Sequence, residues 1–254
     1  MNPTEAYRFL VRETRNFFRK SGFSKSVLGM SGGLDSTMTA HILVDALGEK
    51  NVTALMMPEK GLSSRENFED AVSTAKKLGI KYHVQPINSM VKPFRKLSWK
   101  QGKKAGINVK PRARMMILYN FANSNNALVA GTGNKSELLL GYFTKYGDGG
   151  ADILPIGGVY KTDLRKIAEW KKIPRAIIEK IPTAELFKGQ TDEGEMGISY
   201  AEADEILKKL HDRKISARKL KKEFGSRAVE LIVKRVEKNR HKAGMPFIIK
   251  IGKL

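Results

Sequence analysis

The chain has 254 residues and a formal net charge of +21, and 41% of its residues are hydrophobic. A chain of this length and composition can bury a sizeable core, which excludes a disulfide-stabilised miniprotein and does not favour disorder. It contains no cysteine, so disulfides, thiolate metal sites and cysteine nucleophiles are excluded together. The excess of Lys and Arg predicts an anionic partner, such as nucleic acid or a polyphosphate ligand.

No segment has the composition of a secretion signal or of a membrane span. The first residues carry charges every few positions, and no stretch approaches about 18 uncharged apolar residues. We therefore expect a soluble cytoplasmic protein without a membrane partner.

The first half of the chain alternates between amphipathic helices and short apolar strands. An opening helix is predicted after Asn2 and Pro3 and is expected to end before Gly22. Short apolar runs predict four strands, at residues 26–30, 51–57, 81–85 and 127–131. Helices are predicted between them at 36–47, at about 89–97 and at 112–122. A further helix is predicted to begin at a capping box formed by Ser63 and Glu66 and to end before Gly79. This alternation predicts an α/β fold with a doubly wound parallel sheet.

The remaining part of the chain has a different pattern. A glycine-rich loop at 146–150 and an apolar run at 153–156 precede helices rich in Lys and Glu between residues 200 and 239. No repeat or low-complexity linker divides the chain. We therefore expect a single domain over residues 1–254, with a helical C-terminal extension from about residue 200.

The most informative segment is the turn between the first predicted strand and its helix, which reads Gly29, Met30, Ser31, Gly32, Gly33, Leu34, Asp35 and Ser36. Parallel sheets bind ligands at the carboxyl ends of their strands. Glycines let the backbone approach a ligand closely, and the N-terminus of the following helix offers N–H groups to phosphate oxygens. Ser31 and Ser36 add hydroxyl groups, whereas Asp35 fits a phosphate site only with a metal ion to bind.

The same turn has other interpretations. Asp35 or Ser36 could simply cap the helix after a tight turn. A Walker A loop is not favoured, because its Lys is missing. The pattern GxSxG at 29–33 also matches the nucleophile elbow of serine hydrolases, but that elbow normally follows several strands. Here it follows the first strand, and the four histidines stand elsewhere in the chain, at His41, His83, His211 and His241.

A second loop, at residues 131–137, follows the fourth predicted strand and should open at the same edge of the sheet. Its backbone and Thr132 are candidates for holding a nucleotide. Glu137, in the first turn of the next helix, is a candidate second carboxylate for the same cation. Its alternative role is a favourable interaction with the helix dipole.

Several motifs together resemble a known family. SGGLDS and LGMSGG resemble the pyrophosphate loop of the N-type ATP pyrophosphatases, whose Rossmann-like sheet is of the adenine-nucleotide alpha hydrolase type. Within that superfamily, the chain is similar to the ammonia-dependent NAD synthetases from about residue 29 to residue 242. The motifs that carry this similarity, in order, are GTGNKSE, GYFTKYGDGGADILPIGG, YKTDLR, PTAEL, GQTDEGEMGISY and the terminal HK.

The resemblance implies a homodimer and a two-step reaction. ATP transfers AMP to the nicotinate carboxylate of deamido-NAD with release of pyrophosphate, and ammonia then displaces AMP to form NAD. Mg²⁺ is the implied cofactor, nucleic acid is not an expected partner, and a separate glutaminase could supply the ammonia.

Two alternative functions stay open, a tRNA-modifying ATP pyrophosphatase and a basic RNA-binding module. The first usually needs cysteine, and the second leaves Asp35, Glu137 and Asp148 without a purpose.

Site residues follow from the resemblance position by position. Residues 29–36 correspond to the ATP loop, with Asp35 and Glu137 as Mg²⁺ ligands. Asp148 stands where the family has a carboxylate near the reacting centre, to orient or deprotonate ammonia. The remaining ATP contacts implied are Thr132, Lys161 and Thr183. The contacts implied for deamido-NAD are Arg112, Lys145, Asp152, His241 and Lys242.

Overall fold

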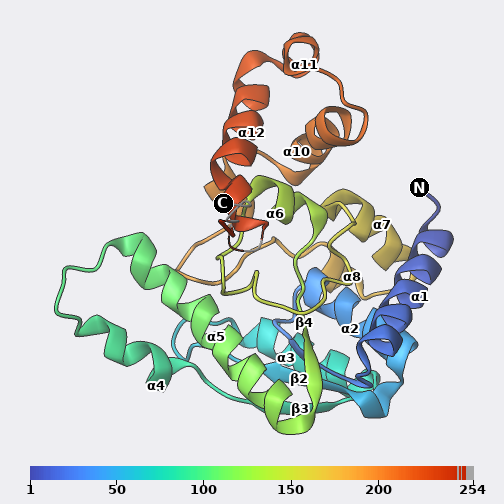
Figure 1. Ribbon diagram of the computed structural model, residues 1–254, viewed down its shortest axis with the longest axis vertical. Helices are drawn as coiled ribbons and strands as arrows, with labels where there is room; N and C mark the ends of the chain where they lie inside the picture. The colour runs from blue at the N-terminus through green and yellow to red at the C-terminus, as the bar shows by residue number, and fades with distance from the viewer. Residues whose placement is uncertain (245, 247, 250–254) are drawn as a thin grey trace, which may run out of the picture.

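The structure is a computed structural model that describes residues 1–244, 246 and 248–249. Its centre is a sheet of four parallel strands in the order β3-β2-β1-β4 (Figure 1). The strands are β1 (Lys25–Gly29), β2 (Val52–Met56), β3 (Lys81–Val84) and β4 (Ala127–Ala130). Each lies within two residues of its predicted position, because each is a short apolar run between polar turns.

Helices cover both faces of the sheet, which confirms the doubly wound α/β prediction. One face carries α1 (Pro3–Ser21), α2 (Leu34–Leu47) and α3 (Arg65–Lys77), whose apolar side chains pack on Leu28 of β1 and its neighbours. The opposite face carries α4 (Asn88–Val91) and α5 (Lys103–Asn125), which pack on Val27 and its neighbours. Because successive strand residues point to opposite faces, both faces of β1 are apolar.

The order of the strands creates a crevice between β1 and β4. The chain proceeds from β1 outward through β2 and β3, and then returns through α5 to add β4 on the other side of β1. Such a reversal leaves the carboxyl ends of two central strands open to a ligand. A parallel bridge between Ala130 and Ile153 extends the sheet beyond β4.

Local capping explains where several helices begin. The side chain of Asn2 accepts hydrogen bonds from the first turn of α1, and Gly22 ends that helix with φ of 75°. The predicted capping box of Ser63 and Glu66 is wrong by one residue. Ser64 caps α3 by accepting a bond from the N–H of Asn67, while the hydroxyl of Ser63 accepts one from the N–H of Glu59.

Helix α5 is longer than predicted. It begins at Lys103 rather than near Arg112 and runs through Pro111. The first part of this helix is rich in basic residues and contains a proline, so its sequence does not have the pattern of a helix. The helical segment predicted at 89–97 is divided between α4 and a 3₁₀ turn, η2 (Lys92–Arg95).

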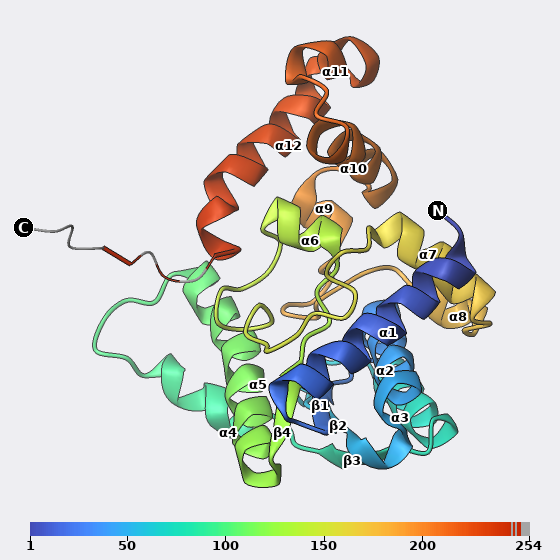
Figure 2. The ribbon, with the colours of Figure 1, turned by 45° about the vertical axis from the view of Figure 1, so that its right-hand side comes forward.

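The second half of the chain forms the helices around and above the crevice. They are α6 (Lys135–Leu140), α7 (Lys161–Trp170), α8 (Arg175–Ile178), α9 (Asp192–Met196), α10 (Tyr200–Leu207), α11 (Ala217–Phe224) and α12 (Ser226–Asn239). Helices α10 to α12 stand on α6 and α7 and share a core with Leu140 and Tyr160 (Figure 2). No helix within the described residues is long and apolar enough to cross a membrane.

Candidate active site

A cavity of about 1070 Å³ opens at the carboxyl ends of β1 and β4. Its walls come from the turn after β1, the loop after β4, α5, the glycine-rich segment around residue 147, and residues 178–195. Most of the predicted site residues line it, namely Gly29, Met30, Ser31, Gly33, Leu34, Asp35, Ser36, Arg112, Thr132, Glu137, Lys145, Asp148, Lys161, Thr183, His241 and Lys242. Gly32 and Asp152 are not among its lining residues.

The turn after β1 is held by its two serines. The hydroxyl of Ser36 donates to the carbonyl of Gly33 at 3.0 Å and lies 3.2 Å from the hydroxyl of Ser31. The hydroxyl of Ser31 also accepts a hydrogen bond from the N–H of Gly33. Neither Asp35 nor Ser36 caps α2, because its N-cap is Gly33 without a side-chain bond. The first N–H groups of α2 therefore face the cavity without a capping side chain, as a phosphate site requires.

Gly32 is required by packing. Its φ of +83° suits glycine, and a Cβ at this position would lie 2.0 Å from the carbonyl oxygen of Asn67 on α3. A larger residue would therefore displace α3 from the turn.

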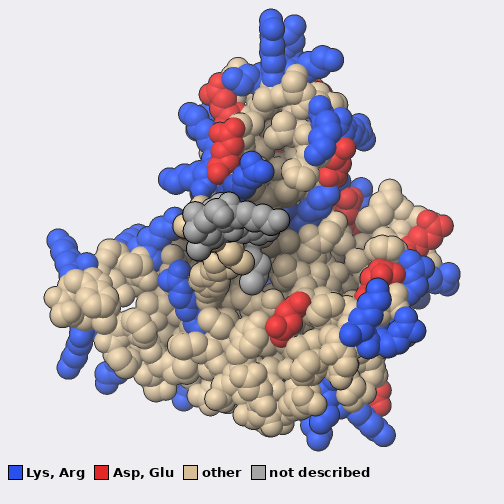
Figure 3. Space-filling view, viewed as in Figure 1, with Lys and Arg blue, Asp and Glu red and all other residues tan. Residues whose placement is uncertain are grey.

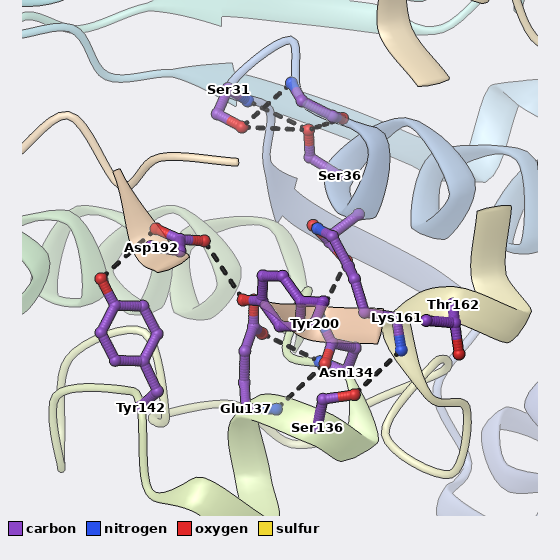
Figure 4. A network of polar contacts seen from close by, with 12 residues as sticks. Ser31, Ser36, Asn134, Ser136, Glu137, Tyr142, Lys161, Thr162, Asp192 and Tyr200 are labelled. Atoms are coloured by element: carbon purple, nitrogen blue, oxygen red, sulfur yellow. Dashed lines mark hydrogen bonds and ion pairs between the residues drawn. The ribbon is translucent and has the colours of Figure 1, made fainter. Parts of the chain in front are cut away.

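Asp35, Lys161 and Glu137 form the charged centre of the site, and Figure 4 shows Lys161 and Glu137 in it. The ammonium of Lys161 forms an ion pair with one carboxylate oxygen of Asp35, and the amide of Asn134 donates to the other at 3.0 Å. Glu137 and Asn134 cap α6 reciprocally, which holds the Glu137 carboxylate at the start of that helix.

The pKa values of Glu137 and Lys161 are shifted by burial and by the charges around them. Burial and the neighbouring Asp35 carboxylate raise the pKa of Glu137 well above its usual range. Burial works against the charged form of Lys161, but the Asp35 and Glu137 carboxylates overcome it and raise the Lys161 pKa. A raised pKa means that Glu137 holds its proton more readily than an ordinary glutamate, and a cation bound beside it would favour its ionised form.

A third carboxylate in this centre, Asp192, was missed by the sequence reasoning. It begins α9 and accepts a hydrogen bond from the hydroxyl of Tyr200 at 3.2 Å and a longer one from Tyr142 at 3.4 Å. Burial raises its pKa, while the positive charge of Lys161 opposes that shift. The motif GQTDEGEMGISY contains Asp192 and Tyr200, and its density of acids before a tyrosine was the available signal.

Asp148 lies in the glycine-rich turn and lines the cavity, with its side chain exposed. One of its carboxylate oxygens accepts a hydrogen bond from the N–H of Thr144 at 2.9 Å. The N–H groups of Gly147 and Gly149 both donate to the carbonyl of Thr144, which closes the turn tightly. Burial raises the pKa of Asp148, although the bond from Thr144 opposes the shift. An acid with a raised pKa in a cavity is suited to proton transfer.

The terminal HK pair is tied to the same wall. The ammonium of Lys242 donates to the carbonyls of Gly141 and Phe143, at 2.7 and 3.1 Å. The ammonium of Lys145 donates to the carbonyl of His241 at 2.9 Å, and the Arg112 guanidinium reaches the Lys145 carbonyl. The chain end thus meets α5 and the glycine-rich turn at the cavity.

Asp152 has a different environment. Its side chain is exposed on the outer side of β4, where one carboxylate oxygen accepts a bond from the N–H of Val129 at 2.7 Å. The other accepts a bond from the hydroxyl of Tyr119 at 3.1 Å. Asp152 is thus bound to β4 and α5 and is not among the lining residues of the cavity.

The serine-hydrolase interpretation has no support in the geometry. In the part of the chain that the structure describes, the hydroxyl of Ser31 contacts Gly33 and Ser36, and no histidine is hydrogen-bonded to it. A nucleophilic serine needs such a base.

Asp35 and Glu137 suit Mg²⁺ as a ligand pair. Mg²⁺ is usually bound through one or two carboxylates together with phosphate oxygens and waters. Within the described residues, no group of three or more His, Cys, Asp or Glu side chains is arranged to hold a metal by itself. The residues present therefore fit a cation that arrives with a phosphate ligand.

Comparisons with known proteins agree with these features. A family model for NAD synthase matches residues 6–246. The NH(3)-dependent NAD(+) synthetase of Archaeoglobus fulgidus is 48% identical over 240 residues, which cover 94% of each chain. The solved NMN synthetase from Francisella tularensis superposes with a TM-score of 0.87 at 31% identity, covering 99% of this chain and all of that one.

A second solved structure, an NH3-dependent NAD synthetase from Campylobacter jejuni, has a TM-score of 0.84 at 32% identity and covers 98% of this chain and 100% of that one. The matched residues include both ends of the cavity, from the turn after β1 to the terminal HK pair. This chain belongs to the NAD synthase family.

Proposed function

We propose that this chain forms NAD from deamido-NAD, ATP and free ammonia. The observation that carries the proposal is that one cavity contains the turn after β1, the Asp35–Lys161 pair with Glu137, and Asp148. A phosphate site and a proton-transfer group thus face the same space. The 48% identity to an ammonia-dependent relative over most of both chains supports the same activity.

The reaction has two steps, and the chain supplies groups for both. In the first, a carboxylate oxygen of the nicotinate attacks the α-phosphorus of ATP, and pyrophosphate leaves with the electron pair of the broken P–O bond. The turn after β1 offers Ser31, Ser36 and the first N–H groups of α2 to the departing phosphates, and Lys161 adds a positive charge. In the second, ammonia attacks the activated carbonyl, AMP leaves, and the nitrogen loses a proton.

Asp148 is the proposed acceptor or orienting group for ammonia. It lines the cavity that also contains the turn after β1, in which the substrate carboxylate would be presented. A raised pKa makes it a better proton acceptor near neutral pH than an ordinary aspartate. No protein nucleophile is needed, because ATP activates the acid and ammonia is the nucleophile.

Asp35 and Glu137 are the proposed Mg²⁺ ligands. When bound with ATP, the ion would neutralise charge on the phosphates and so stabilise the leaving group. The carboxylates also hold Lys161 in its charged form at the same place. Thr132 and Thr183 line the cavity as proposed nucleotide contacts.

We also propose that two copies associate through the outer face of α5. Met116 on this face is 46% exposed, and Tyr119, one turn further, contacts Asp152. Asp152 is not among the lining residues of the cavity in its own chain, and a second copy beside β4 would place it near an interface. The proposed deamido-NAD contacts in the same chain remain Arg112, Lys145, His241 and Lys242, which line the cavity.

A reaction that consumes ATP and forms a dinucleotide fits the expected cytoplasmic location.

The proposal is tested by giving the purified chain ATP, deamido-NAD and either ammonium or ammonia-free glutamine, with and without Mg²⁺. We expect NAD, AMP and pyrophosphate in equal amounts from ammonium with Mg²⁺, and none from glutamine. Because one similar structure is an NMN synthetase, nicotinate mononucleotide is supplied in parallel. If the mononucleotide is amidated preferentially, it is the substrate in place of deamido-NAD. Pyrophosphate release in the absence of both deamido-NAD and nicotinate mononucleotide would contradict the proposal.

A further inference from the structure

Arg165 is a cation in the cavity for which the steps above have no use. It lies on α7 one helical turn after Lys161, and both side chains line the cavity. The Nε atom of Arg165 is buried and has no hydrogen-bond partner among the described residues. A buried donor without an acceptor is costly, so this arrangement indicates an acceptor that the chain itself does not supply.

Packing places Arg165 at the phosphate end of the cavity. Leu164 and Ile167, on either side of it in α7, belong to one buried cluster with Leu34 and Ile178. Leu34 is the first residue of α2 and lines the cavity as part of the turn after β1. The cavity wall beside Arg165 is therefore the wall formed by that turn.

Among the described residues, no ion pair joins Arg165 to a carboxylate, and three acidic residues of the surrounding elements pair with other cations. Asp35 forms an ion pair with Lys161, and Asp163 pairs with Lys166 and Lys208. Asp70, on α3, pairs with Lys180. The guanidinium of Arg165 thus keeps its donors for a ligand, and its planar fork matches two phosphate oxygens at once.

We propose that Arg165 binds the β- and γ-phosphates of ATP and retains the pyrophosphate after it leaves. The proposal rests on the proposed function. As the bond between the α-phosphorus and its bridging oxygen breaks, the electron pair and one additional negative charge pass to pyrophosphate. Arg165 would stabilise that charge beside the α2 N-terminus, while Lys161 remains beside Asp35.

The test compares Arg165→Gln and Arg165→Lys with Lys166→Gln, a change at the next residue on the exposed side of α7. Binding of inorganic pyrophosphate with Mg²⁺, and separately of AMP, is measured by calorimetry after thermal melting has shown that each variant is folded. Loss of a charge-assisted bidentate contact should weaken pyrophosphate binding by about tenfold or more in Arg165→Gln. Arg165→Lys should lie between it and the parent, and AMP binding should stay within about twofold in all variants.

Unchanged pyrophosphate binding in folded Arg165→Gln would overturn the proposal, as would an equal loss of AMP affinity, which would place Arg165 at the adenosine end. If Lys166→Gln weakened pyrophosphate binding as much as Arg165→Gln, the effect would come from the general surface charge, and the proposal would also be overturned. These outcomes are separable from failure of the proposed function. A parent protein that binds pyrophosphate but forms no NAD would contradict the function while leaving the Arg165 contact standing.

Discussion

At the scale of single residues, Asp148, the proposed group for ammonia, has a raised pKa that implies a cost to stability at high pH. In the unfolded chain its carboxyl titrates at the ordinary value, whereas burial raises its pKa in the folded protein. Between these two pH values the folded form keeps a proton that the unfolded form has lost. The free energy of unfolding therefore falls as pH rises through that window, and the full loss is present above the raised pKa.

Asp148→Asn should therefore remove activity and at the same time stabilise the protein at alkaline pH. The amide is neutral, so the melting temperature near pH 8 should rise by roughly a few degrees for a chain of this size. The gain should shrink as pH is lowered toward the ordinary carboxyl pKa, and melting curves across this range measure it. A gain that does not change with pH would show that the charge of Asp148 is not its cause.

Asp212→Asn is the matched control with the opposite sign. Burial opposes its ionisation, but hydrogen bonds from Lys135 and Tyr160 dominate and lower the pKa of Asp212. Its stabilising contribution is present above the ordinary value and is lost as pH falls through the lowered one. The control should melt slightly lower than the parent at neutral pH, and the difference should disappear in acid.

At the scale of helices, Asp204 connects the C-terminal extension to the charged centre. It lies in α10 and is completely buried. One oxygen accepts a bond from the hydroxyl of Ser136 on α6, and the other accepts one from the N–H of Thr162 on α7 at 2.8 Å. The hydroxyl of Ser136 in turn accepts a hydrogen bond from the backbone N–H of Lys161 at 2.9 Å. We therefore propose that the extension and the sheet behave as one domain, joined at this carboxylate.

Asp204→Asn should impair ATP binding although Asp204 does not line the cavity. An amide can satisfy only one of the two donors, so α6 and α7 would no longer be held in register at Glu137 and Lys161. We expect the KM for ATP to rise about tenfold with a smaller change in kcat. Ser136→Ala should show the same defect, and the two changes should be non-additive in that KM, because they break one network. The exposed neighbour Glu205→Gln is the control, and additive losses would contradict the positioning role.

At the scale of the whole molecule, the charge and the amino-acid composition have separate consequences. Basic side chains gather on the outer end of the C-terminal helices and on the end of the molecule formed by α4 and the start of α5 (Figure 3). Between Asp70 and Glu137 the sequence contains no acidic residue at all. Two polyanionic ligands account for cations in the cavity but not for these, and nothing in the structure explains them.

The absence of cysteine from the whole sequence bears on the nitrogen donor. Release of ammonia from glutamine normally uses a dedicated nucleophile, most often cysteine. Free NH₃ rather than ammonium is then the attacking species. At fixed, limiting total ammonium the rate should therefore rise by about tenfold per pH unit below the pKa of ammonium, until folding or ATP binding fails. Initial rates between about pH 7 and 8.5 measure this, and a flat profile would contradict direct attack by NH₃.

Much of this molecule could be predicted from the sequence, and the exceptions have physical causes. Strands that are buried on both faces read as apolar runs, and Asn2 and Gly22 have the local capping chemistry of a helix start and end. The positions of Asp35 and Glu137 at one edge follow from parallel strands. Asp192 and Arg165 could not be placed, because their roles depend on how distant segments pack around the cavity. The assignment of Ser63 as a cap failed because Ser64, one residue on, is an equally good one.

Asp152 has a consequence that concerns solubility rather than catalysis. Strand β4 is an end strand of the sheet, and its outer row of backbone groups would otherwise be open to pairing with other molecules. The carboxylate of Asp152 accepts a hydrogen bond from the N–H of Val129, and the backbone N–H of Asp152 donates one to the carbonyl of Val129. We expect this local closure, together with its charge, to hinder the edge-to-edge strand pairing by which proteins aggregate. A position that resembles a substrate contact thus also protects the folded molecule when it is concentrated or heated.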